Sequence, residues 1–348
     1  MRSPSLSLAP DRSRGTIATR FAPVSEVRSG LKRNVMACIR YGRRSECGDD
    51  PREVPLTLEP LGCVGLPADF GIPVELWTSD RAVDFDRADG IGFSHNGEFL
   101  FGHIYLLEVE LGAVAAAAFQ AYARVTAFLE RQGYPRLLRC WNFLHDINRG
   151  AQDQERYRQF CLGRYQALSG NPGFEFQLPA ATAIGMHEPG LLVYFLAGKT
   201  SGVQVENPRQ VPAFQYPRAY GPRSPSFSRA TFARFGGQPH LLVSGTASVV
   251  GHATQHPDDT PAQFDETLAN LEALLAHGAA QHLAGGRWEP QTLRLFLRGH
   301  AALAAIRERL EQAFAGHTPL MLLEGDICRR DLHLEIEGLY QAADAAPP

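Results

Sequence analysis

Several features that would assign this 348-residue chain to a common class are missing. No stretch approaches the ~20 apolar residues of a membrane-spanning helix, so we expect no membrane association. The six cysteines are scattered and form no C-x-x-C pair, which argues for reduced thiols in a cytoplasmic protein and against disulfides or a zinc site. The chain also lacks the G-x-G-x-x-G, Walker, G-x-S-x-G and H-E-x-x-H motifs, so we expect neither a nucleotide cofactor nor serine-hydrolase chemistry.

The most informative absence is that of negative charge between residues 207 and 257, although the whole chain has a net charge of −3. Residues 214–235, within this window, hold six aromatic rings and four arginines: Arg218, Arg223, Arg229 and Arg234. Guanidinium groups without opposing carboxylates, set among rings, suit a small ligand that is anionic and flat. A solvated Arg-rich loop is one alternative. A nucleic-acid surface is another, but a pI of about 6.5 gives no overall basic field, so we expect no nucleic acid.

The first 53 residues differ in composition from the rest of the chain. They hold eleven Lys or Arg against six Asp or Glu and are rich in Ser, Pro and Gly. They lack the apolar core of a secretory signal. We therefore expect residues 1–53 to form a basic, disordered tail, with Met36 as an alternative start.

The remainder alternates strand and helix patterns and predicts an α+β fold with mixed sheets. Its first half predicts strands at 55–65, 99–110 and 137–147, helices at 112–133 and 152–168, and a strand pair at 191–198 and 202–207. Its second half repeats this order, with strands at 239–251, 292–299, 319–327 and 332–340 and helices at 260–282 and 301–316. A capping box, Thr260 to Gln263, opens the first of these helices. We expect two similar units produced by duplication, residues 54–205 and 206–345, with a site between them or beside the Arg-rich window.

The last predicted strand carries a pair of carboxylates. Because side chains alternate across a strand, Leu332, Leu334 and Ile336 should face the core. His333, Glu335 and Glu337 should then share the other face. This is either a solvated outer strand or a place where a buried carboxyl keeps its proton and acts as a general acid.

Other residues have weaker signals. The segment Ser244-Gly245-Thr246-Ala247-Ser248 is either a tight turn or a site of close ligand approach through backbone N–H groups and hydroxyls. Arg164 is either a substrate clamp or a surface residue of a helix. His252 and His256 have no evident third ligand, so we expect no metal site.

Several motifs together resemble the chorismatase family. They are YPRAYGPRSPSFSRA, LLVSGTASVVGHAT and DICRRDLHLEIEG in the second half, and CWNFLHDIN and RYRQFCLGRYQAL in the first. The resemblance covers about residues 55 to 340 and implies two units of the YjgF/RidA fold and no cofactor. It also implies removal of pyruvate from chorismate, a dicarboxylate on a cyclohexadiene ring.

The resemblance assigns roles to individual residues. It implies that Glu335 protonates the enolpyruvyl methylene and that Arg164 and Arg218 hold carboxylates. It lines the pocket with Tyr216, Phe227, Gly245, Thr246, Ala247 and Ser248. Cys328, seven residues before Glu335, has the spacing of the branch that makes a hydroxybenzoate, so we expect 3-hydroxybenzoate with or without 4-hydroxybenzoate.

Three alternatives stay open at this point. They are a chorismate hydrolase that releases a dihydroxycyclohexadiene carboxylate, a RidA-like imine deaminase, and a small-molecule-binding module without turnover. We expect chorismate as the partner of a monomeric chain.

Overall fold

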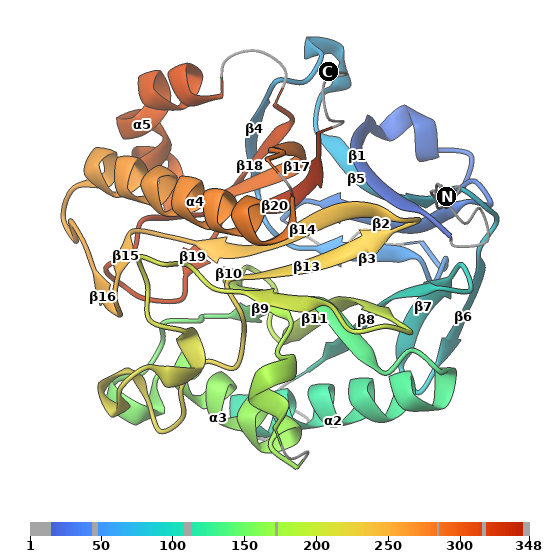
Figure 1. Cartoon of the computed structure of the whole chain (residues 1–348), viewed down its shortest axis with the longest axis horizontal. Coiled ribbons are helices and arrows are strands. Elements are labelled where there is room, and N and C mark those ends of the chain that lie inside the picture. Colours follow the sequence, from blue (N-terminus) through green and yellow to red (C-terminus); the bar gives the residue numbers. More distant parts are fainter. Residues whose placement is uncertain are drawn as a thin grey trace, which may run out of the picture.

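Two seven-stranded sheets lie face to face, and a pair of helices covers the outer face of each (Figure 1). This computed structural model describes residues 15–43, 48–107, 113–170, 173–283, 285–314 and 318–343. The fold is therefore of the mixed α+β class, as the alternating sequence patterns predict. Among the described residues, no helix has both the length and the apolar character that crossing a bilayer requires.

The first sheet is built mainly from the N-terminal half. Its strands, in spatial order, are β19 (Asp326–Ile327), β10 (Ala180–Met186), β9 (Arg136–His145), β11 (Leu191–Gly198), β8 (Phe99–Leu106), β7 (Ile91–His95) and β6 (Asp84–Ala88). Helices α2 (Val114–Gln132) and α3 (Arg156–Leu168) cover its outer face over one apolar core. Helix α2 ends at Gly133, whose φ of 78° is a left-handed cap that glycine adopts without strain.

The second sheet is built mainly from the C-terminal half. Its strands are β12 (Val203–Val205), β13 (Ala230–Phe235), β14 (Gln238–Thr246), β20 (Leu334–Ala342), β17 (Trp288–Leu297), β18 (Leu320–Glu324) and β4 (Pro60–Val64). Helices α4 (Thr260–His282) and α5 (Gly299–Ala313) cover its outer face over a second core.

The two sheets repeat one topology. The run β7-β8-α2-β9-α3-β10-β11 matches the run β13-β14-α4-β17-α5-β18-β20 in both chain order and neighbours in the sheet. In each run the two strands joined by the second helix are parallel, and the other pairs are antiparallel. The repeat agrees with the expected pair of similar units, and its origin by duplication stays a prediction.

The expected boundary at residues 205 and 206 separates the two repeats but not the two sheets. Strands β4 and β12 come from the first segment but pair in the second sheet. Strand β19 comes from the second segment but pairs in the first sheet. The predicted strand at 55–65 is thus two strands, β3 (Glu53–Leu56) and β4, in different sheets. The predicted pairing of 191–198 with 202–207 is wrong as well, because β11 pairs with β8 and β9, and β12 pairs with β13.

The expectation of a disordered tail over residues 1–53 is wrong for its described part. Strands β1 (Ile17–Pro23), β5 (Pro73–Ser79), β2 (Val35–Tyr41) and β3 form a four-stranded sheet. Strand β1 contacts β17, and β2 contacts β7 and β8, so this sheet packs beside both large sheets. Ile17, Phe21 and Ile39 are buried, and this burial outweighs the polar, basic composition of the segment. Residues 1–14 and 44–47 lie outside the described part.

The start of α4 differs from the predicted capping box. Asp259, not Thr260, is the N-cap, and its carboxylate accepts the N–H of Ala262 at 2.9 Å. The Gln263 side chain instead binds the loop before β20, donating to the carbonyl of Asp331 and accepting the N–H of His333. His333 therefore lies towards α4, where its Nδ1 is 2.8 Å from the Thr260 hydroxyl, and it does not share the face of Glu335.

Candidate active site

A cavity of about 300 Å³ opens where the two sheets meet at β10 and β14. The Ala181 N–H donates to the Ser244 hydroxyl at 2.8 Å and ties these two strands together. Helix α3, the loop from Gln210 to Arg229 and the loop from Cys328 to Leu332 complete the wall. The cavity thus lies between the two repeats and beside the Arg-rich window, where the sequence predicted a site.

Glu335 presents a buried carboxyl to this cavity from β20. The residue is 4% exposed, and burial raises its pKa to about 8, with a further rise from Glu337. Arg139 and Arg229 act in the opposite direction, favouring the ionised form. Near neutral pH the carboxyl is therefore predominantly protonated and can donate a proton.

A glycine makes room for this carboxyl. A Cβ at Gly245 would lie 1.7 Å from Glu335 Oε1, a separation that no side chain tolerates. The pairing of β14 with β20 shifts register between Val243 and Thr246, at this glycine. The irregularity and the missing side chain together let the carboxyl lie against the backbone of β14.

Two arginines supply unpartnered N–H groups among the cavity-lining side chains. Arg164, on α3, is 3% exposed, and its Nε and one Nη have no hydrogen-bond partner. Arg229 donates to the Val211 carbonyl and the Tyr216 hydroxyl, and its Nε has no hydrogen-bond partner. Because a buried donor without an acceptor is costly, these groups are suited to bind an anionic ligand.

Aromatic rings from the loop between Gln210 and Arg229 line part of the cavity. Phe227 lies 5.3 Å and Tyr216 5.5 Å from the Arg229 guanidinium carbon, measured to the ring centres. Arg329 lies over the rings of Tyr216 and Tyr220 and donates to the His252 carbonyl. Flat apolar faces and cationic edges therefore meet in one space.

Cys328 lines the same cavity from the loop before β20. Burial raises the pKa of its thiol to about 12, and the nearby Glu335 adds to that rise. The sulfur is therefore a neutral thiol near pH 7 and not a thiolate. Cys63, Cys140, Cys161 and Cys328 are free thiols.

Most of the sequence-predicted site residues meet at this cavity. Those that line it are Glu335, Cys328, Arg164, Tyr216, Phe227, Gly245 and Ala247.

Arg218, Thr246 and Ser248 are not among the lining residues. Arg218 is exposed and pairs with Asp153 at 2.5 Å on the surface, so its guanidinium is already occupied. The Thr246 hydroxyl donates to the Ser244 carbonyl and the Ser248 hydroxyl to the Gln255 carbonyl, so both stabilise the local backbone.

Sequence reasoning did not select Arg229, Thr182, Tyr157 or Gln210, all of which line the cavity. Arg229 belongs to the acid-free window, but nothing in the sequence separates it from Arg218 or Arg223. Arg223 instead stacks over Tyr165. Thr182 lies on β10, a strand that the sequence patterns did not reveal.

Within the part of the chain that the structure describes, one group of residues could offer metal ligands. Glu59, His300 and Glu324 bring potential ligand atoms within 4.8 Å of one another. None of them lines the cavity, and Glu59 pairs with Arg43.

A buried acid with a raised pKa, two arginines and aromatic rings surround one small cavity, an arrangement suited to binding a small anion. Comparisons with known proteins give the family. Residues 75–197 match the family model described as chorismatase FkbO/Hyg5-like, N-terminal. A 3-hydroxybenzoate synthase of Streptomyces hygroscopicus is 39% identical over 278 residues, which are 76% of this chain and 80% of that protein. A chorismatase of Streptomyces rapamycinicus is 34% identical over 275 residues, 76% of this chain and 81% of that one.

The fold agrees with the sequence comparison. A chorismatase crystal structure superposes with a TM-score of 0.80 at 30% identity, covering 94% of this chain and 99% of the other. The chain therefore belongs to the chorismatase family. A YjgF-family structure from Neisseria meningitidis covers 35% of the chain with a TM-score of only 0.27, so the YjgF-like character of the units stays a prediction.

Proposed function

We propose that this protein converts chorismate to 3-hydroxybenzoate and pyruvate, with Glu335 as the general acid. The observation that carries the proposal is the buried Glu335 carboxyl, whose pKa of about 8 keeps it protonated beside a cavity with two arginines. The family supplies the substrate, and the relative named 3-hydroxybenzoate synthase supports this product.

The cavity offers complementary partners for both carboxylates of chorismate. Arg164 and Arg229 line the cavity from different elements, α3 and the Arg-rich window, and each has an N–H without a hydrogen-bond partner. Phe227 and Tyr216 offer faces for the cyclohexadiene ring. Holding the substrate in one orientation is a large part of what such a site contributes to rate.

The chemistry begins with one proton. Glu335 gives its proton to the enolpyruvyl methylene carbon, whose double-bond electrons form the new C–H bond. The adjacent carbon, bonded to the ether oxygen, becomes an oxocarbenium centre, and Glu335 becomes a carboxylate. Well-placed general acids contribute roughly 10²–10⁴-fold to rate.

The conversion of chorismate to hydroxybenzoate and pyruvate needs neither water nor an oxidant. Hydroxybenzoate and pyruvate together contain all the atoms of chorismate. For 3-hydroxybenzoate, the neighbouring ring hydroxyl adds to the oxocarbenium carbon and loses its proton. The C–O bond between that oxygen and the ring then breaks as a proton leaves the ring carbon that bears the ether oxygen, which makes the ring aromatic. The bond between the ether oxygen and the former enolpyruvyl carbon opens last, so the ether oxygen becomes the phenol and pyruvate keeps the other oxygen as its keto group. A hydrolase would instead add one water and release a dihydroxycyclohexadiene carboxylate. Cys328 supports the first outcome, because its neutral thiol occupies a part of the wall where a smaller residue would leave space for water.

The experiment is incubation of purified protein with chorismate, without metal or nucleotide, followed by chromatography with mass detection. Pyruvate with 3-hydroxybenzoate supports the proposal, and 4-hydroxybenzoate beside it would indicate a dual-product enzyme. Pyruvate with a non-aromatic diol would keep the acid but overturn the product. Intact chorismate would return the imine deaminase and the binding module to consideration.

The matched variant is Glu335→Gln, which keeps the shape of the side chain and removes its proton. We expect pyruvate release to fall by about 10²-fold or more, because no other acid takes this position. Circular dichroism and the melting temperature should stay near those of the unmodified protein. Turnover within about twofold of the unmodified protein would remove Glu335 from the mechanism.

Three further properties remain predictions. Activity after dialysis tests independence of cofactors, light scattering tests the monomeric state, and cell fractionation tests the cytoplasmic location.

A further inference from the structure

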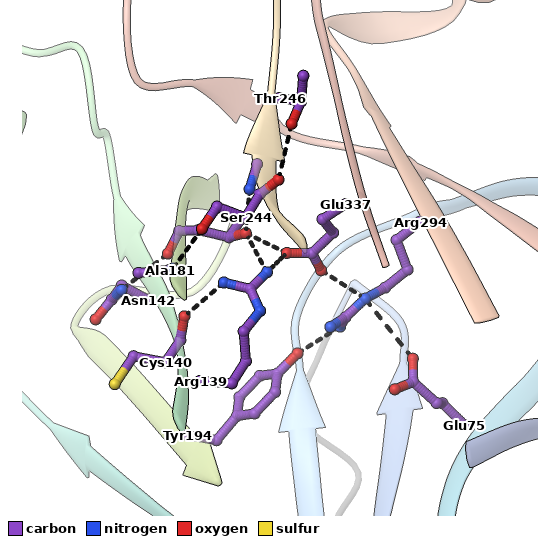
Figure 2. A network of polar contacts seen from close by, with 12 residues as sticks. Glu75, Arg139, Cys140, Asn142, Ala181, Tyr194, Ser244, Thr246, Arg294 and Glu337 are labelled. Carbon is purple, nitrogen blue, oxygen red and sulfur yellow. Dashed lines mark hydrogen bonds and ion pairs between the residues drawn. The ribbon is translucent and has the colours of Figure 1, made fainter. Parts of the chain in front are cut away.

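Four charged side chains are buried together in one network of polar contacts (Figure 2). They are Glu75 on β5, Arg139 on β9, Arg294 on β17 and Glu337 on β20. Their side chains are between 1% and 5% exposed. Burying ions is expensive, and a buried ion pair is weak evidence for stability, so this group calls for a functional explanation.

Glu337 is the centre of this quartet. Arg139 donates to one of its oxygens at 2.5 Å. Arg294 Nε lies 2.7 Å from the other oxygen, an ion pair that lacks hydrogen-bond alignment. Arg294 also lies 3.7 Å from Glu75 and donates to the Tyr194 hydroxyl. Glu75 accepts hydrogen bonds from Trp77 and Tyr41, which extends the network to β2.

Thr182 joins the quartet to the cavity. Its hydroxyl donates to Glu337 and accepts from Arg139 at 2.6 Å and from the Gly245 N–H at 3.0 Å. One hydroxyl has one donor and two acceptor positions, so this one is fully used. Gly245 is the residue against which the Glu335 carboxyl lies. Glu335 and Glu337 are two residues apart on β20 and therefore extend from the same face of the strand.

The quartet contains two positive and two negative charges and is neutral as a whole. The negative charge of Glu337 disfavours ionisation of Glu335. It thereby offsets the effect of Arg139, which favours the ionised form of Glu335. The charged and titratable groups that face Glu335 come from five elements: Glu337 on β20, Arg139 on β9, Arg229 before β13, Tyr157 on α3 and Cys328 on its loop.

We propose that Glu337 is a positioning residue whose carboxylate, fixed by Arg139, Arg294 and Thr182, keeps the neighbouring Glu335 as the proton-bearing acid. The proposal rests on the function proposed above and adds a second carboxylate that never contacts the substrate. It explains why a costly ion network lies directly behind the catalytic group.

The test is the pH dependence of kcat/KM for Glu337→Gln. Removing this negative charge leaves Glu75 against Arg139 and Arg294, a net charge of +1 near Glu335, which favours the ionised carboxylate. The alkaline limb of the profile, expected near pH 8 from the Glu335 pKa, should move about 1–2 units towards lower pH. The variant should lose about 5- to 50-fold in kcat/KM at pH 8 and recover most of that loss as the pH is lowered.

A second variant restores the charge balance. Arg139→Met combined with Glu337→Gln removes one positive and one negative charge and leaves the Glu75–Arg294 pair. The alkaline limb should then return towards pH 8. If the double variant does not fold, Glu75→Gln removes a negative charge at the far end of the network. Like Glu337→Gln, this variant should move the alkaline limb towards lower pH, but by a smaller amount.

A direct titration separates this proposal from the proposed function. Nuclear magnetic resonance of protein with ¹³C-labelled glutamate side chains, with and without Glu335→Gln for assignment, follows the Glu335 carboxyl without any turnover. A lower midpoint in Glu337→Gln supports the proposal even if chorismate proves not to be the substrate. An unmoved midpoint, or a loss of activity equal at every pH, overturns it.

Discussion

At the scale of single residues, the position of the Glu335 carboxyl depends on residue 245 being a glycine, which has no side chain. Glu335 Oε1 occupies the space that a Cβ at Gly245 would need. Gly245 has no left-handed backbone angle, so steric exclusion and not backbone freedom is the reason for glycine here.

We therefore predict that Gly245→Ala displaces the acid and lowers kcat by about 10²-fold, since small misplacements of reacting groups have effects of this size. Steady-state kinetics on chorismate measures this. Gly170→Ala is the control, because a Cβ at that exposed glycine would meet nothing within 4 Å. Equal kcat values in the two variants would show that the carboxyl does not need its present position.

Cys328 is the second residue whose chemistry the structure limits. Its raised pKa makes the thiol neutral, so its contribution is shape and weak polarity. We predict that Cys328→Ala shifts product from the hydroxybenzoate towards the dihydroxycyclohexadiene carboxylate, because the smaller methyl group leaves space for water. Product ratios by chromatography measure the shift, with Cys63→Ala on β4 as a control away from the cavity. An unchanged ratio would mean that the thiol does not direct the product.

At the scale of secondary-structure elements, one arginine holds the loop that carries Cys328. The Arg298 side chain donates to Leu332 O, Ile327 O and Arg329 O at 3.1–3.2 Å and also binds Asp326 and Asn148. A planar guanidinium can reach all of these acceptors at once, with three of them sharing the two N–H groups of Nη2.

Arg298→Lys keeps the charge and cannot reproduce this set of contacts. We predict a lower kcat, by up to about 10²-fold, together with a changed product ratio, because the loop sets the distance between Cys328 and Glu335. Arg309→Lys is the control, since Arg309 lies on α5 and pairs with Asp265 at the surface. A variant that loses thermal stability but keeps the product ratio would show that Arg298 is purely structural.

At the scale of the whole molecule, the two repeats are alike in topology but not in chemistry. Leu191 pairs with Leu144 as Leu334 pairs with Leu297. These registers place Leu192, buried and apolar, where the second repeat has Glu335. The first repeat therefore lacks the acid at this position, and it contributes Arg164 and Thr182 to the cavity that the second repeat provides with Glu335.

The N-terminal sheet is part of this assembly, because β2 and β5 supply Tyr41, Glu75 and Trp77 to the buried network. We predict that a chain beginning at Met36 is unstable, since it lacks β1 and the buried Ile17, Phe21 and Val27. Each such side chain contributes ~1.5–3 kcal/mol. Their sum is comparable with the 5–15 kcal/mol that typically stabilises a folded domain.

Thermal unfolding and soluble yield measure this effect. A chain lacking only residues 1–14, which keeps β1 whole, is the control. Equal melting temperatures for the two truncated chains would contradict the role given to β1.

Local patterns in the sequence were sufficient to predict the type and the bounds of the long helices. The helices at 112–133 and 260–282 appear as α2 and α4 within one or two residues, because helical periodicity is a property of consecutive residues. Alternation along β20 likewise placed Glu335 and Glu337 opposite Leu334 and Ile336. The motifs that resemble chorismatases gave the family, which the comparisons confirm.

Only the tertiary structure decided which groups meet. The acid-free window predicted arginines at a site. Arg218 instead pairs at the surface with Asp153, 65 residues away, whereas Arg229 lines the cavity. Composition predicted disorder for residues whose strands are stabilised by pairing with β5, a segment far along the chain. The sequence placed two glutamates on one face of a strand, but the partners that make one an acid and the other an ion come from β9, β10, β14 and β17. Those contacts depend on long-range strand pairing, which no local pattern encodes.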